Sequence, residues 1–459
     1  MSILPAGLTA LASIVQDNTL VREFNDALFP ELLYRDEAMA ERWESGLGET
    51  RIMTRASLLA PVTTPLTAGA DPVPVSPSYE QWVVSANQYS SSLDTSMQAN
   101  WAALAPLFMR NAKTLGLQAG QSMNRLVRDA LFQAYTGGDT HATAAGAAVT
   151  ALPVDSIAGF TEVLVDGRPA TISPSHPKTI TISGVAGTHS VTAAGPTDPL
   201  VPLGPGTLTL AAAATWAVDA QVRATDAPAI IRAGGAADAD GLTAVSGISL
   251  EQIRLAVAIM RRNRVPTHAD GFYHVHLDPL AESQLFRDNE FQRLNQSVPD
   301  NMRYARFAVG RMLGCIFITN NESPNALNSG TLVATGRGSA EIASATGAIT
   351  RNKAGVGLVR SIVTGGGSIY ERWIDESAAF STEAGYTGKV GSFSIVNGGL
   401  QVSTDRVRYI LRAPQDRLQQ VVSQSWSFSG GWAIPSDSGG GLSASRFKRA
   451  VTIESGSND

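Results

Sequence analysis

The sequence feature that most constrains the fold is a long helical pattern that runs from about Ser96 to Tyr135. Its apolar residues recur every three or four positions and fall on one helix face: Trp101, Leu104, Phe108, Leu115, Ala119, Met123, Leu126, Ala130 and Ala134. At roughly 1.5 Å per residue such a helix spans about 50 Å or more, which a small globular domain rarely needs. We therefore expect a spine that carries the other parts of the chain.

Proline and glycine residues define the ends and the packing of this spine. Pro106 either opens its regular part or kinks it. Gly116 and Gly120 each weaken an isolated helix by roughly 1 kcal/mol relative to alanine, so they predict close packing of another backbone. Gly137–Gly138 is expected to end the helix, because glycine adopts a positive φ without strain.

The composition narrows the class of protein. The chain has 459 residues, enough for several domains, and only 16% of them are charged, where about a quarter is usual. A large surface with few charges favours extensive contact with other proteins. The net charge of −5 argues against tight binding to nucleic acid, Cys315 is the only cysteine, and no apolar run approaches a membrane span. We expect a soluble protein, made in the cytoplasm, without disulfides or a membrane partner.

The residues before the spine predict two extended parts. Residues 1–48 carry a helical stripe that includes Phe24 and Leu28, so they form either an arm that lies on another subunit, which is favoured, or a helical subdomain of the same chain. Two strand-like segments follow, Arg51–Leu58 and Tyr79–Ser92, on either side of a proline-rich stretch. Such a hairpin is too thin to be stable alone and needs a neighbour, unless the stretch is a disordered loop over its own subunit.

A β-rich segment follows the spine. Small-residue linkers lie at Gly137–Ala148 and Gly234–Gly241, and between them, at about Leu152–Arg232, short alternating strands are separated by Gly, Pro and Asp. This spacing fits an all-β sandwich or barrel of roughly a hundred residues or fewer. The matching linkers predict a domain inserted at 142–241 into a host fold that resumes at Ser249.

The rest of the chain mixes helices and strands, which makes the predicted fold class α+β. Helices are expected at Ser249–Arg264, where Ser249 is the N-cap, at Leu280–Leu294 and around Ile369–Phe380. Strands are expected at Phe272–Leu277, Cys315–Thr319, Gly357–Val363, Phe393–Val396, Arg408–Leu411, Asp416–Trp432 and Arg446–Glu454.

Six short stretches and the order of the predicted parts carry a family resemblance. The stretches are Gly48–Arg55, Leu66–Ala70, Gln88–Asp94, Gly137–His141, Gly271–Phe286 and Gly310–Ile318. They resemble the major capsid proteins of tailed bacteriophages with the HK97-like fold, in the branch that contains the podovirus coat proteins. The resemblance covers nearly the whole chain except the β insertion, whose position differs from that in the best-known podovirus coat.

The resemblance implies an HK97-like capsid fold plus an inserted all-β domain. The implied parts are an N-terminal arm at 1–48, an E-loop hairpin at 49–95, the P-domain spine helix at 96–141, the inserted domain at 142–241, a P-domain helix at 242–268, an A-domain at 269–412, and returning P-domain strands with the C-terminal tail at 413–459. The implied function is self-assembly, as pentamers and hexamers, into the icosahedral head that encloses the double-stranded DNA genome.

Partners and location follow from the same resemblance. The protein would be assembled in the host bacterial cytoplasm and would end in the virion. A separate scaffolding protein is expected, because no charged coiled-coil segment precedes the arm, and a portal and a decoration protein are further candidates. Contact with packaged DNA would be weak and non-specific.

Contacts between subunits are expected at the arm, the hairpin and the C-terminal basic group. The candidate residues are Phe24, Leu28, Leu66, Trp82, Tyr89 and Arg449. Residues 49–95 contain no lysine, so the lysine–asparagine crosslink of some relatives cannot form through this hairpin. Replacement of Trp82 by alanine is expected to impair assembly and to leave the monomer folded.

No catalytic, cofactor or metal site is predicted, and the protein is not expected to be an enzyme. Gly385–Lys389 has the wrong spacing for a phosphate loop, Asp437–Gly439 is half of an aspartic-protease site, and Cys315 lies in an apolar strand. His274 and His276 share a strand face, but no carboxylate or cysteine at useful spacing completes a metal site. Core or interface histidines are therefore the favoured interpretation.

Two basic groups and one rival function remain open. Arg261–Arg264 and Arg446–Arg449 either line packaged DNA or, as is favoured, form salt bridges between subunits or a solvated helix end. The rival function is that of a phage tail, fibre or adhesin-type β-rich structural protein. It would predict repeats along the chain, and the sequence contains none.

Overall fold

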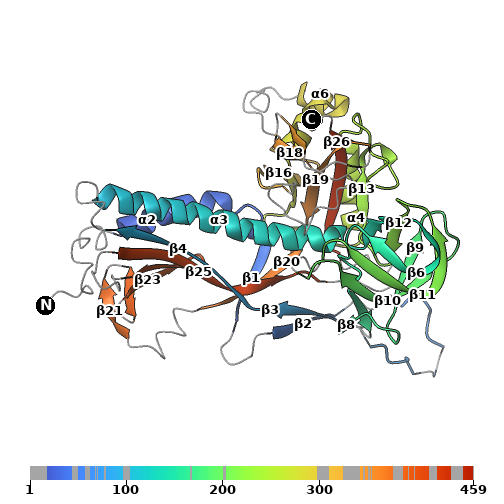
Figure 1. Ribbon diagram of the computed structural model, residues 1–459, viewed down its shortest axis with the longest axis horizontal. Coiled ribbons are helices and arrows are strands. Elements are labelled where there is room, and N and C mark those ends of the chain that lie inside the picture. The colour runs from blue at the N-terminus through green and yellow to red at the C-terminus, as the bar shows by residue number, and fades with distance from the viewer. Residues whose placement is uncertain are drawn as a thin grey trace. The chain divides into compact units, whose positions relative to one another are not determined.

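The structure, a computed structural model, has the mixed α+β class that the sequence predicts (Figure 1). It describes residues 18–43, 50–56, 62–67, 69, 71–76, 79–96, 104–165, 168–199, 203–296, 310–323, 342–344, 347–349, 352, 354–375, 386–390, 392–396, 399–412, 421–435 and 448–457. The chain divides into two compact units. The first unit comprises Met1–Arg51, Val84–Arg128 and Ile369–Ala433, and the second comprises Ile52–Val83, Asp129–Ser368 and Ile434–Asp459.

The predicted spine is present as helix α3, Leu104–Thr136. Its 33 residues correspond to about 50 Å at 1.5 Å per residue. Pro106 lies in the first turn, where the missing N–H has no intrahelical partner to lose, so it opens the helix. Gly138 follows the helix with φ +84°, which confirms the predicted glycine stop.

An eight-stranded sheet forms the framework of the first unit. Its order is β1-β20-β25-β24-β23-β22-β21, and β4 pairs with β25 as well. The strands are β1 Ala38–Trp43, β4 Asn87–Ser96, β20 Ile369–Ile374, β21 Tyr386–Val390, β22 Phe393–Val396, β23 Gly399–Thr404, β24 Val407–Arg412 and β25 Val421–Ala433. β1 pairs with β20 in parallel, whereas the other pairs of this sheet are antiparallel. The sequence pattern of residues 1–48 predicts mainly helix and misses β1.

Helices α2 (Thr19–Leu28) and α3 pack on this sheet and close one hydrophobic core. Short 3-10 turns follow α2 at Phe29–Glu31 and Arg35–Glu37. The core joins α2, α3 and the sheet through Leu20, Phe24, Leu28, Phe108, Leu115, Ala119, Met123, Tyr409, Trp426 and Phe428. The predicted arm is therefore wrong for α2, because the stripe that would lie on another subunit is buried in its own chain. The helical subdomain, the alternative reading, is the one observed.

The predicted hairpin divides into a short ribbon and a separate strand. β2 (Thr50–Ala56) and β3 (Tyr79–Ser85) form a two-stranded sheet by themselves. The segment predicted as one strand, Tyr79–Ser92, breaks at Ala86, and its second half is β4 in the eight-stranded sheet. Between β2 and β3 the described residues contain neither helix nor strand.

A second sheet carries most of the host fold in the second unit. Its order is β13-β26-β19-β14-β16-β15, with β13 Ile230–Arg232, β14 Tyr273–Leu277, β15 Arg311–Met312, β16 Cys315–Thr319, β19 Gly357–Thr364 and β26 Ala450–Ser457. The helices around its core are α4 Leu250–Arg262, α5 Pro279–Arg287 and α6 Asn289–Gln296. Ser249 and Gln252 form a capping box at the start of α4, as the N-cap prediction requires. A small ribbon, β17 Ile342–Ser344 with β18 Gly347–Ile349, and a 3-10 turn at Ala233–Gly235 complete the elements described here.

The inserted domain is a six-stranded antiparallel barrel with a core of its own. The strand order is β5-β12-β9-β10-β11-β6, with β5 Asp139–His141, β6 Gly146–Val154, β9 Lys178–Ile182, β10 His189–Pro196, β11 Gly206–Trp216 and β12 Gln221–Ala224. The sheet closes on itself because Ala142, directly after β5, bridges to Val154 of β6. A hairpin of β7 Glu162–Val165 and β8 Arg168–Thr171 accompanies it.

The boundaries of the insertion differ from the prediction of 142–241. The barrel begins at Asp139 and its last strand ends at Ala224, whereas Ile230–Arg232 already belongs to the host sheet. Part of the predicted linker Gly137–Ala148 is therefore strand. Small residues that read as a linker in the sequence form ladder hydrogen bonds here, because neighbouring strands supply the partners.

The C-terminal half contains two wrong predictions. The strands from β20 to β24 join the first unit through β25 instead of an A-domain that ends at residue 412, and β26 pairs with β19 and β13 instead of β25. The helix predicted around Ile369–Phe380 is strand β20 as far as Ile374. β20 lies between β1 and β25, so its backbone groups are satisfied on both edges and tertiary pairing overrides helical propensity.

Candidate functional site

The ribbon and its connecting segment expose a set of large apolar side chains. We define the hairpin surface as Ile52, Val62, Leu66, Val73, Val75, Tyr79 and Val83. Val62 and Val73 are more than 80% exposed, and Leu66 is 62% exposed. Clustered apolar exposure of this kind is typical of a surface that binds another protein.

The buried side of β3 corrects one expectation. Trp82 is 4% exposed and Val84 is fully buried, so they alternate with exposed Val83 as the period of a strand requires. Replacement of Trp82 by alanine would open a cavity in the folded chain and destabilise it by about 3–5 kcal/mol. The variant predicted to leave the monomer folded therefore cannot test assembly.

The other predicted contact residues are in four different environments. Phe24 and Leu28 are fully buried in the core of the first unit, so they cannot contact another subunit in this fold. Tyr89 is partly buried, with its ring centroid 5.9 Å from that of Trp432. Arg449 donates from Nη1 to the carbonyl oxygen of Gly366 at 2.8 Å. Leu66 is thus the predicted residue whose side chain is freely presented.

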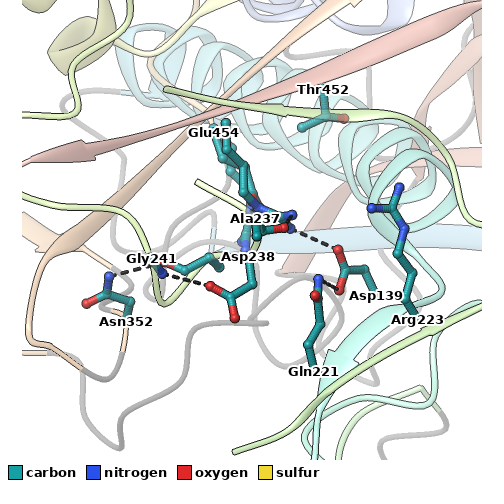
Figure 2. Close-up of polar contacts among 12 residues, drawn as sticks. Asp139, Gln221, Arg223, Ala237, Asp238, Gly241, Asn352, Thr452 and Glu454 are labelled. Carbon is teal, nitrogen blue, oxygen red and sulfur yellow. Dashed lines mark hydrogen bonds and ion pairs between the residues drawn. The ribbon is translucent and has the colours of Figure 1, made fainter. Parts of the chain in front are cut away.

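A buried cluster of charges joins the barrel to the host sheet, and we call it the charged joint (Figure 2). Glu454 of β26 accepts hydrogen bonds from Nε of Arg232 at 2.9 Å and from Nε of Arg360 at 3.0 Å. Arg232 also donates from Nη2 to Asp139, in the first barrel strand, at 3.0 Å. Two guanidinium groups thus face two carboxylates, and the cluster is balanced in charge.

The electrostatics of the joint favour the ionised carboxylate. Burial by itself would raise the pKa of Glu454, but Arg360 and Arg232 outweigh it and hold this pKa below its usual range. Burial would likewise lower the pKa of Arg232, and Glu454 and Asp139 reverse that effect and raise it. Removal of one partner from such a cluster leaves an uncompensated buried charge.

Neighbouring loops are attached to the same joint. Arg232 donates from Nη1 to the carbonyl oxygen of Ala237 at 2.8 Å, and Gln221 of β12 donates to Asp139 at 2.8 Å. Asn352 donates to the carbonyl oxygens of Ala239 and Leu242 (Figure 2). The predicted linker Gly234–Gly241 is therefore an anchored loop.

A second charge cluster lies inside the first unit. Arg35 is fully buried and donates to both carboxylate oxygens of Glu371, at 3.0 and 2.9 Å. Arg406 approaches Glu371 at 3.2 Å and Asp405 at 3.1 Å. Arg35 also lies over the ring of Phe428, 5.2 Å from its centroid. This cluster ties the segment after α2 to β20 and to the turn between β23 and β24.

Sequence reasoning missed both clusters because their members are far apart in the chain. Arg232 and Glu454 are separated by 222 residues, and Arg35 and Glu371 by 336. No local spacing links such residues. A charged residue inside an apolar strand pattern, such as Glu454 after Ile453, is the signal that points to a buried ion pair.

The chemical motifs of the sequence are placed as follows. Gly385 and Asp437–Gly439 lie outside the described residues, while Tyr386–Val390 is an edge strand. Cys315 is buried, and burial raises the pKa of its thiol to about 11, which makes it a poor nucleophile. His276 is fully buried, whereas His274 is hydrogen-bonded to Asp270, a carboxylate that the sequence reading did not connect with it. Among the residues that the structure describes, no helix has the length and apolar character needed to cross a membrane.

Comparison with solved structures finds similar folds among phage capsids. The chain is similar to the capsid asymmetric unit of cyanophage Pam1, at 10% identity over 95% of this chain and 93% of that chain, with a TM-score of 0.47. It is also similar to the capsid of cyanophage P-SCSP1u, at 11% identity, 93% and 88% coverage and a TM-score of 0.44. The capsid of Ralstonia phage GP4 gives 11% identity, 92% and 88% coverage and a TM-score of 0.43. No protein-family model and no curated protein matches the sequence.

Proposed function

We propose that this chain is the major capsid protein of a tailed bacteriophage and that it self-assembles into the icosahedral head around the double-stranded DNA genome. The observation that carries the proposal is the hairpin surface: a two-stranded ribbon whose connecting segment presents apolar side chains to solvent. A ribbon of this size is marginally stable alone, so a neighbouring subunit is its natural support. The spine helix and the six resembling stretches support the same assignment.

Repeated weak contacts explain how such a subunit would form a shell. Each hairpin side chain buried against a neighbour contributes about 1.5–3 kcal/mol, while the first association costs about 4–15 kcal/mol of rigid-body freedom. One contact therefore holds a pair of subunits weakly. Within a pentamer or hexamer the later contacts are effectively intramolecular, so the assembly is far more stable than any pair.

The proposed role is structural rather than catalytic. The two charge clusters are buried and balanced, which suits them to hold parts of one chain together. A separate scaffolding protein, a portal and a decoration protein are the partners proposed with this role. DNA contact would be weak and non-specific, and the mature location would be the virion, after assembly in the host cytoplasm.

Negative-stain microscopy of the expressed protein, with and without a co-expressed scaffolding protein, tests the assignment. Closed shells are the expected product. Fibres would instead favour a tail, fibre or adhesin component, and small discrete particles in both preparations would contradict the capsid assignment.

A substitution on the hairpin surface tests the part given to this ribbon. Leu66→Asp should reduce shell yield at least about tenfold, because burial of an unpaired carboxylate opposes the contact, while exposure of Leu66 keeps the monomer folded. Leu66→Met keeps the surface apolar and should assemble normally. Circular dichroism checks that both variants fold. Normal shell yield from Leu66→Asp would remove the hairpin from the proposal.

A further inference from the structure

Two imidazole rings lie face to face beside strand β14 in the second unit. His268 precedes the strand and His274 lies within it, with ring centroids 4.1 Å apart and planes inclined by 9°. One nitrogen of each ring lies within 4.8 Å of one nitrogen of the other. Both side chains are partly exposed, so a dissolved ion can reach them.

The hydrogen bonds around the pair define which nitrogen of each ring carries the proton. The Thr364 hydroxyl donates to the carbonyl oxygen of His274 at 3.4 Å, so its oxygen is left to accept from Nε2 of His268 at 3.3 Å. Nε2 of His274 lies 2.8 Å from a carboxylate oxygen of Asp270, which can only accept while it is ionised. Both neutral rings therefore have the proton on Nε2 and the lone pair on Nδ1.

Asp270 is suited to this orienting role. The small effect of burial would raise its pKa, but hydrogen bonds from His274 and from the Phe272 backbone N–H outweigh it and lower the pKa. The carboxylate therefore stays ionised and holds the ring of His274. A carboxylate behind a histidine is the usual outer partner of an imidazole that binds a metal.

We propose that His268 and His274 form a binding site for a divalent transition-metal ion of the zinc type, with their Nδ1 atoms as ligands and Asp270 and Thr364 as orienting partners. At a Zn–N distance of about 2.1 Å, two nitrogens on one ion lie about 4.2 Å apart or less. The rings need only small rotations to reach that spacing. Water completes the coordination in a site with two protein ligands. The sequence reading, which paired His274 with buried His276, predicted no such site.

Titration of Zn²⁺ into the full-length, EDTA-treated protein tests the site, by isothermal calorimetry at pH 7.5. The wild-type chain should bind one ion at this site, and His268→Gln or His274→Gln should weaken binding at least about tenfold. Asp270→Asn should weaken it by about 10–100-fold without changing the stoichiometry. His176→Ala, in an exposed histidine of the barrel, is the matched control and should bind as the wild type does.

Co²⁺ gives a second readout that does not depend on heats of binding. Its visible absorption should intensify with the wild type and with His176→Ala, and should stay that of the aqueous ion with His268→Gln. Undiminished one-to-one binding by the doubly substituted protein, or no binding by the wild type, would overturn the proposal. The result is independent of shell formation, because it is measured on unassembled chains.

Discussion

At the scale of single residues, two glutamates organise the buried charge of this protein. Glu454 and Glu371 each lie between two arginines, and each pair of arginines is matched by a further aspartate, Asp139 or Asp405. Buried charges are expensive to desolvate, so these clusters add little to net stability compared with apolar packing. Their effect is to specify which strands meet, because a wrong pairing would leave a charge buried without a partner.

Glu454→Gln should lower the free energy of unfolding by about 3–5 kcal/mol, because it leaves two buried guanidinium groups short of negative charge. Urea unfolding at pH 7 measures this change. Glu290→Gln is the matched control: its ion pair with Arg254 is about half exposed, and its loss should cost no more than about 1 kcal/mol. The pKa of Glu454 is lower in the folded chain than its ordinary 4.5, so its contribution is present above about pH 4.5 and is lost as pH falls through the lowered value. The gap between wild type and variant should therefore shrink in acid, and a gap that stays constant to low pH would contradict the assigned role.

At the scale of elements, the spine helix shows how one small residue sets a helix contact. A Cβ added at Gly116 would collide with the carbonyl oxygen of Phe24, so α2 packs against α3 at a distance that only glycine allows. The sequence predicts this close approach from the presence of glycine in a helix, but not which element makes it. Leu20, Phe24 and Leu28 fill the contact, which is why α2 stays on its own chain.

Gly116→Ala should destabilise the folded chain by about 1–3 kcal/mol, because overpacking against a backbone atom exceeds the gain in helix propensity. Lys113→Ala, at an exposed position of the same helix, should change stability by no more than about 0.5 kcal/mol. Thermal unfolding followed by circular dichroism compares the two. A stabilised Gly116→Ala variant would mean that α2 does not pack against this point.

At the scale of the whole molecule, the inserted barrel has what an independent domain needs. Its core comprises residues such as Leu152, Ile180, Leu208 and Val222, which are buried among themselves. The Ala142–Val154 bridge closes the sheet, so the barrel has no long open edge to pair with another chain. The charged joint attaches it to the host sheet through Asp139.

Residues 137–228, expressed alone, should therefore fold with a single cooperative transition and a stability of roughly 5 kcal/mol or more. Leu208→Ala in this fragment should cost about 2–5 kcal/mol, because Leu208 is fully buried. Guanidinium titration followed by tryptophan fluorescence of Trp216 measures both values. A fragment without a cooperative transition would show that the barrel depends on the host fold.

By itself the sequence determined the elements whose pattern is local. The spine helix, the capped helix after Ser249, the strand Cys315–Thr319 and the existence of an inserted all-β domain follow from periodicity and from cap and turn residues. The exposure of Leu66 in a proline-rich segment follows as well, because such a segment cannot lie in a central strand.

Only the tertiary structure decided which elements meet. Strand β20 reads as helix until β1 and β25 flank it, and β26 reads as a partner of β25 until it pairs with β19. Phe24 reads as a surface for another subunit until α3 covers it. The physical reason is common to all of these cases: backbone pairing, burial and ion pairing between distant residues depend on partners that no local window of sequence contains.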